Sequence, residues 1–60
     1  MAQLSEKELA TLQDLLADEE LLVKKFKMLA EYSTDQEVKT KYEQISQKHQ
    51  NHFNTLYALI

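Results

Sequence analysis

The sequence contains no cysteine, no glycine and no proline. Without cysteine there is no disulfide, no thiolate metal ligand and no cysteine nucleophile, and this absence suits a reducing cytoplasm. Without glycine and proline there is no support for phosphate-binding or dinucleotide-binding loops, or for the tight turns of β-hairpins. The remaining residues are rich in Leu, Lys, Glu, Gln and Ala, which favour helices, so the sequence predicts an all-α protein.

Long runs of one residue class are also missing. The net charge is -3, and the densest basic patch, Lys24, Lys25 and Lys27, is too short for a nucleic-acid surface. No stretch approaches the ~20 apolar residues of a membrane span. Residues 1–5 have neither the charged nor the apolar segment of a secretory signal peptide. We therefore expect a cytoplasmic protein that binds neither nucleic acid nor membranes.

Two capping boxes mark where helices begin. Ser5 is followed three residues later by Glu8, the spacing at which a hydroxyl and a carboxylate satisfy free backbone N–H groups of a first turn. Thr34 and Glu37 repeat that spacing within the mid-chain cluster of small polar residues, 33–35. A second helix is therefore expected to start there.

These signals divide a single domain, residues 1–60, into two helices. We predict one helix over about 6–32, a turn at about 33–34 and a second helix over about 35–59. So short a turn makes the helices antiparallel. A domain this small needs association, a bound metal or very regular helix packing to be stable.

Apolar residues recur at alternating steps of three and four along each predicted helix, as in the core seam of a helical bundle. The first row is Leu9, Leu12, Leu16, Glu19, Val23, Phe26 and Ala30. The second row is Val38, Tyr42, Ile45, His49, His52, Leu56 and Leu59. Folding the chain at the turn places Phe26 opposite Tyr42 and Glu19 opposite His49, with His52 one turn along.

A further apolar stripe lies beside the first row, at a spacing of seven residues. It consists of Leu15, Leu22 and Leu29, with Leu21 and Met28 next to it. A single hairpin cannot cover so wide a face, and exposed apolar patches usually mark an interaction surface. We expect a homodimer through these residues that completes a four-helix, ferritin-like bundle. A monomer with apolar edges is the alternative.

Glu19, His49 and His52 interrupt the two apolar rows, where an unpaired carboxylate would be costly. The three residues could bind one or two transition ions, since Zn, Fe, Mn and Cu accept imidazole and carboxylate ligands. Ferritin-type bundles use a Glu-x-x-His motif at the spacing of His49 and His52, with Glu at the first position. The alternatives are a buried hydrogen-bonded network that fixes register, or histidines that reach water at the bundle margin.

No other group of residues indicates catalysis. Tyr32, Tyr42 and Tyr57 are expected to pack in the bundle or to lie at its rim. Ser46 lies one turn from His49, but no third group is present to form a nucleophilic triad. We therefore expect no enzymatic activity.

The order of residues along both helices carries a family pattern. Its residues are Glu19 through Ala30 with Lys25 and Phe26, then Asp35, Glu37, Lys39, Tyr42, Ile45 and His49. From about residue 4 to 59 the chain thereby resembles the spore coat protein F family of endospore-forming bacteria, whose members look like ferritin-related bundles. Phe26 stands where that family commonly has Tyr, and His49 stands where it often has Glu.

The resemblance implies a structural role in coat or spore assembly, with the spore coat as location and other coat proteins as partners. It also implies that this chain is a single unit that dimerises. The rival hypothesis is a ferritin-like di-metal module for storage or oxidation. A third hypothesis is an adaptor whose surface at Leu21 and Met28 binds a different protein.

Overall fold

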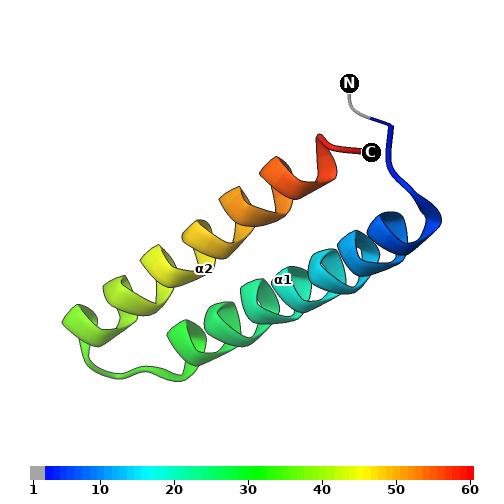
Figure 1. Cartoon of the computed structure of the whole chain (residues 1–60). Coiled ribbons are helices and arrows are strands. Elements are labelled where there is room, and N and C mark those ends of the chain that lie inside the picture. The colour runs from blue at the N-terminus through cyan, green and yellow to red at the C-terminus, as the bar shows by residue number, and fades with distance from the viewer. Residues whose placement is uncertain (1–2) are drawn as a thin grey trace.

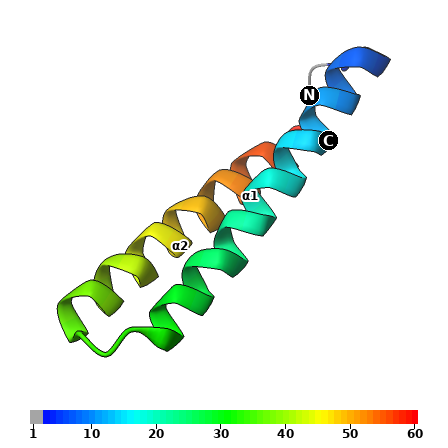
Figure 2. The same cartoon turned by 90° about the horizontal axis from the view of Figure 1, so that it is seen from below.

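The computed structural model describes residues 3–60 as two helices that lie side by side in an antiparallel hairpin (Figure 1). Helix α1 spans Glu6–Tyr32 and helix α2 spans Gln36–Tyr57. The start of α1 and the end of α2 lie at the same end of the hairpin, where α1 runs past the end of α2 (Figure 2). No strand occurs among the described residues, so the predicted all-α hairpin is confirmed. Within residues 3–60, neither helix is long and apolar enough to cross a membrane.

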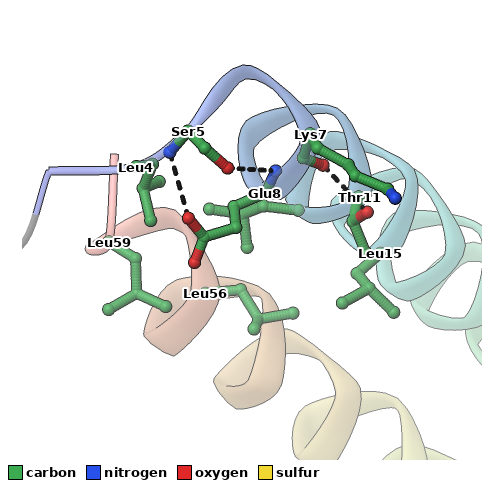
Figure 3. Close-up of a pocket in the computed structure, with 9 residues that line it drawn as sticks. Leu4, Ser5, Lys7, Glu8, Thr11, Leu15, Leu56 and Leu59 are labelled. Carbon is green, nitrogen blue, oxygen red and sulfur yellow. Dashed lines mark hydrogen bonds between the residues drawn. The ribbon is translucent and has the colours of Figure 1, made fainter.

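Helix α1 begins with the predicted capping box, which Figure 3 shows. The Ser5 hydroxyl accepts a hydrogen bond from the backbone N–H of Glu8, and the Ser5 N–H donates to the Glu8 carboxylate, both at 3.1 Å. The backbone N–H of Ser5, and then its hydroxyl, lower the pKa of Glu8. Because this folded-state pKa is lowered, the carboxylate stabilises the helix above its ordinary pKa. That stabilisation is lost as the pH falls through the lowered value.

Helix α2 has a different cap from the predicted one. Asp35, and not Thr34, is the N-cap, and its carboxylate accepts from the backbone N–H of Val38 at 3.0 Å. The capping box predicted at Thr34 is therefore wrong, because a carboxylate one residue later is the stronger acceptor for the free N–H groups. The Ser33 hydroxyl donates to the Asp35 carbonyl at 3.1 Å and closes the turn.

Helix α2 also ends at Tyr57, two residues before the predicted end. The N–H of Leu59 donates to the carbonyl of Leu56 at 3.0 Å, and that of Ile60 donates to Tyr57 at 3.1 Å. These bonds span three residues instead of four, so the last turn is tighter than an α-helix. Leu59 consequently lies beyond the helix.

Replacing Asp35 with Ala should lower the free energy of unfolding by about 1 kcal/mol, because the N–H of Val38 loses its acceptor. The matched control is Thr34→Ala, which should change stability by less than about 0.5 kcal/mol. Urea unfolding followed by circular dichroism measures both variants. A larger loss for Thr34→Ala than for Asp35→Ala would place the cap one residue earlier.

Helix α1 packs on α2 through the row that its apolar spacing predicts. Leu12, Leu16, Val23 and Ala30 are buried, and Phe26 is half-buried. These positions recur at steps of three and four, so they share one side of the helix. The orientation of α1 in the hairpin is therefore the predicted one.

Helix α2 is rotated relative to the prediction. Tyr42, Ile45, His49 and Leu56 of the predicted row are half-buried, but the packed side also includes residues that were not predicted. Ser46 is buried and its hydroxyl donates to the Val23 carbonyl at 3.1 Å, and Phe53 beside it is half-buried. Val38, predicted to face α1, is 40% exposed, and His52 and Leu59 are exposed as well. A serine side chain is small and can bond a helix carbonyl, so α2 is turned with Ser46 toward α1. The side carrying Val38 and His52 then forms an edge of the hairpin.

The hairpin is a plate one helix thick, since its Cα positions extend 46 × 17 × 9 Å. One broad face is polar, with Lys27, Glu43, Gln47 and Gln50 around Ser46. The other is apolar and carries Leu15, Leu22 and Leu29 of α1 with Val38 and Ile45 of α2. Leu15 is 45% exposed and Leu29 is 40% exposed. We call this second side the open face, because nothing within residues 3–60 covers it.

Candidate metal centre

The three predicted polar residues meet on one side of the hairpin. Glu19 lies in the buried row of α1, three residues after Leu16 and four before Val23. His49 and His52 lie one turn apart on α2, on the side toward the open face. Their positions on the two helices thus bring a carboxylate and two imidazoles together, as predicted, near the middle of the hairpin.

The Glu19 carboxylate lies between the two imidazole rings. Nδ1 of His49 is 2.6 Å from Oε1, and Nδ1 of His52 is 3.4 Å from Oε2. An ionised carboxylate can only accept, so in that state the hydrogen bond runs from Nδ1–H of His49 to Oε1 of Glu19. The side chains of Glu19 and His49 are largely buried, at 19% and 22% exposed, whereas that of His52 is 53% exposed. The pair Glu19–His49 is therefore internal, and His52 is the solvent-facing member.

Aromatic rings hold the orientation of His49. The Phe26 ring stacks on it with centroids 6.0 Å apart and 13° between the planes. On its other side Phe26 contacts Tyr42 at 6.0 Å, as the predicted pairing of these residues requires. The His52 ring meets His49 edge-on at 5.5 Å. The role of Phe26 beside His49 was not predicted, although Phe26 follows Glu19 by seven residues, two turns along the same row.

The donor set fits a divalent transition metal. Glu19, His49 and His52 each offer one ligand atom, and these atoms lie within 4.8 Å of one another. A tetrahedral zinc ion with bonds of about 2.1 Å holds its ligand atoms about 3.4 Å apart. The donor atoms of Glu19 and His49, 2.6 Å apart, must therefore separate by roughly 1 Å. The most distant donors must close in by up to about 1.4 Å, and the half-exposed His52 side chain has room to move. Two nitrogens and one oxygen suit Zn, Fe or Mn.

Metal binding at Nδ1 displaces the proton from that nitrogen. A neutral imidazole can carry its proton on either ring nitrogen, so His49 can move it to Nε2 and coordinate without a change of charge. Glu19 then exchanges its hydrogen bond from His49 for a bond to the ion. The same three side chains thus serve either as a hydrogen-bonded cluster or as ligands.

The structure ties the remaining candidates to packing or to the surface. The Ser46 hydroxyl is engaged with the Val23 carbonyl, which removes it as a nucleophile. Tyr32 is 76% exposed and Tyr57 is 61% exposed. Lys24 pairs with a glutamate on the exposed surface at 3.0 Å. The chemistry of the described residues is therefore concentrated in Glu19, His49 and His52.

A hollow of about 560 Å³ lies away from this cluster, between the start of α1 and the end of α2. Figure 3 shows the side chains of Leu4, Leu15, Leu56 and Leu59 gathered there. Its polar lining residues include Ser5 and Glu8, which already bond each other as the cap of α1. Since Leu15 also belongs to the open face, we treat the hollow as the end of that face and not as a ligand site.

Comparison with known proteins does not assign this site. The chain matches no family model, and no curated protein or solved structure matches it significantly. The site is therefore identified by its own geometry.

Replacing His49 alone with Leu should lower the free energy of unfolding by about 1–3 kcal/mol in EDTA, because the Glu19 carboxylate loses its donor at 2.6 Å. Replacing Glu19 and His49 together with Leu should recover most of that loss or exceed the parent stability, since both polar partners become apolar. Urea unfolding at one protein concentration measures this coupling.

The matched control for this cycle is Glu20→Leu combined with His49→Leu. Glu20 is the neighbour of Glu19 but lies on the exposed surface, where it pairs with Lys24. The effect of Glu20→Leu on the free energy of unfolding should therefore add to that of His49→Leu without coupling. The internal pairing of Glu19 with His49 would be contradicted if Glu19→Leu added to His49→Leu as independently as Glu20→Leu does. A Glu19/His49 double variant that does not fold in EDTA would contradict it as well.

Proposed function

We propose that this protein is a non-enzymatic structural module that assembles as a homodimeric four-helix bundle with a metal-binding Glu/His cluster in its core. The observation that carries the proposal is that Glu19, His49 and His52 converge beside an uncovered apolar face. A lone hairpin leaves both the apolar face and the metal ligands open to water. A second hairpin seated on that face would bury the apolar surface and enclose the metal ligands.

Pairing is supported by the small core of the hairpin. Its buried apolar residues are Leu12, Leu16, Val23 and Ala30, and no side chain of the described residues falls below 2% exposure. Chains this short are only marginally stable without association, a bound metal or very regular helix packing. The open face offers leucines at seven-residue spacing along α1 with Val38 and Ile45 along α2. This is the core pattern of a four-helix bundle, and a two-fold axis is the commonest way to complete it.

The metal is proposed to be Zn, Fe or Mn, held by Glu19, His49 and His52. Bound between two hairpins, the ion would act as a cross-link that stabilises the bundle. The proposal of a structural role is supported by the state of Ser46, whose hydroxyl is bonded to a backbone carbonyl.

The biological setting that we propose is coat or spore assembly. Its support is the resemblance of the chain to the spore coat protein F family, carried by residues along both helices. Within such an assembly the partners would be a second copy and other coat proteins. Leu21 and Met28, exposed next to the open face, are proposed to border the dimer interface.

The second candidate is a ferritin-like di-metal module that stores or oxidises metal. It is favoured by one observation, the two histidines one turn apart on α2 with a glutamate facing them from α1. This function needs bound iron or manganese and a reaction with oxygen. A protein that binds zinc but leaves ferrous iron in air unchanged would exclude it.

Native mass spectrometry of untagged protein with zinc, manganese or ferrous iron tests the proposal directly. We expect a dimer that carries a fixed number of one or two ions, because each chain supplies one set of donors. His49→Leu should abolish stoichiometric binding and leave the dimer intact. A dimer without stoichiometric metal would indicate that the cluster is a hydrogen-bonded network that fixes the register of the helices. A persistent monomer would favour an adaptor that binds a different protein.

A charge on the open face should break the dimer. Leu29→Lys should raise the dimer dissociation constant by at least about tenfold, because burying an unpaired ammonium group in the interface is unfavourable. Gln47→Lys is the matched control, since Gln47 is exposed on the opposite, polar face around Ser46. Sedimentation velocity over a concentration series measures both variants. A stronger effect of Gln47→Lys would move the interface to the polar face.

A further inference from the structure

His52 belongs both to the candidate metal centre and to the side of α2 that carries the open face. Its side chain is 53% exposed, against 19% for Glu19 and 22% for His49. It follows Ile45 by seven residues, so both lie on the same side of α2. A second copy seated on the open face would therefore cover the ligand that a single hairpin leaves in water.

Covering the cluster without a metal is unfavourable. The carboxylate of Glu19 would lose its remaining water, and each copy would bring its own carboxylate to the interface. Like charges repel more strongly in a low-dielectric interior than in water. A divalent ion at each cluster cancels this negative charge and bonds the imidazoles. With the ion bound, covering the cluster therefore favours dimer formation instead of opposing it.

The coordination sphere also points toward the second copy. Three protein donors leave a tetrahedral ion with one free position. His49 is backed by the stacked ring of Phe26 and by the contact with Glu19, so the free position lies on the exposed side, next to His52. That is the side where a second copy brings an identical set of donors. Exclusion of water there would strengthen every bond to the ion.

We infer that metal binding at Glu19, His49 and His52 is linked to the pairing of two copies, so that the ion tightens the dimer. By thermodynamic reciprocity the dimer must also tighten ion binding. With one ion at each of its two clusters, each ion gains the square root of the factor by which saturating metal tightens the dimer. This inference rests on the proposed function, because it requires both the site and the dimer. It adds that assembly responds to the availability of a divalent transition metal.

Sedimentation equilibrium in EDTA and in excess zinc tests the linkage. The dimer dissociation constant of the parent should fall by at least about tenfold in zinc. His52→Gln should abolish that zinc response, so that the dimer dissociation constant of the variant is the same in EDTA and in zinc, because the ion loses one of its three donors. The matched control adds Asn51→His to His52→Gln, which keeps two histidines but moves one about 100° round α2. This control should also be insensitive to zinc.

The reciprocal measurement keeps the test independent of any one variant. Leu29→Lys with Val38→Lys places charge on the open face at positions that are each 40% exposed in the hairpin and make no contact with the cluster. Zinc titration calorimetry should show an affinity per site that is weakened by the square root of the factor by which zinc tightens the parent dimer. Circular dichroism verifies that the variant remains helical.

Two outcomes would overturn the linkage while the proposed function stands. One is zinc bound at a fixed ratio with the same dimer constant in EDTA and in zinc. The other is a dimer that loosens when zinc binds. If neither zinc binding nor dimer formation is detected at any concentration, the proposed function fails and the linkage fails with it.

Discussion

The arrangement of the hairpin depends on where the charge of Glu19 can be accommodated. This carboxylate stands in the row of α1 that packs on α2, and its partners are His49 at 2.6 Å and His52 at 3.4 Å. A slip of α2 by one turn, about 5.4 Å, would leave Glu19 with one imidazole at most, because His49 and His52 are themselves one turn apart. Leucines at these positions would tolerate such a slip, because apolar contacts are not directional. The Glu/His cluster thereby favours this register of the two helices over its neighbours.

The second constraint is geometric, since two helices side by side can cover only one side of each other. In a plate 9 Å thick, both broad faces remain in contact with solvent. One of them is polar around Ser46, and the other carries Leu15, Leu29 and Val38 at 40–45% exposure. The Glu/His cluster lies toward this apolar side. The part of the molecule that most needs cover is therefore also the part that carries its metal ligands.

Sequence reasoning succeeded where one local signal dominated. The Ser5–Glu8 capping box and the strong apolar row of α1 predicted the start of that helix and the side that is buried. At the start of α2, Thr34 and Asp35 compete as caps, and spacing alone cannot rank two adjacent acceptors. The row of α2 was misplaced because Val38 and Ile45 are more apolar than Ser46. Apolar spacing indicates that a position needs cover, but not which element covers it.

The position of the candidate site could be predicted from residue spacing, whereas the aromatic contacts around it could not. Glu19 and His49 interrupt apolar rows, and polar interruptions in facing rows have to meet. The stacking of Phe26 on His49 depends on side-chain rotamers and on the rotation of α2, which no spacing pattern encodes. The greater exposure of His52 follows from that rotation too, because turning Ser46 toward α1 carries His52 to the edge.

The geometry also bears on the choice between a structural and a catalytic ion. Structural zinc sites are closed by protein ligands, whereas catalytic sites keep a position open to water or substrate. In a single hairpin that position lies beside the exposed His52. A second hairpin on the open face would fill the space through which a substrate must enter. The apolar surface that favours pairing therefore also favours an enclosed ion, and a dimer held by such an ion has little room for turnover.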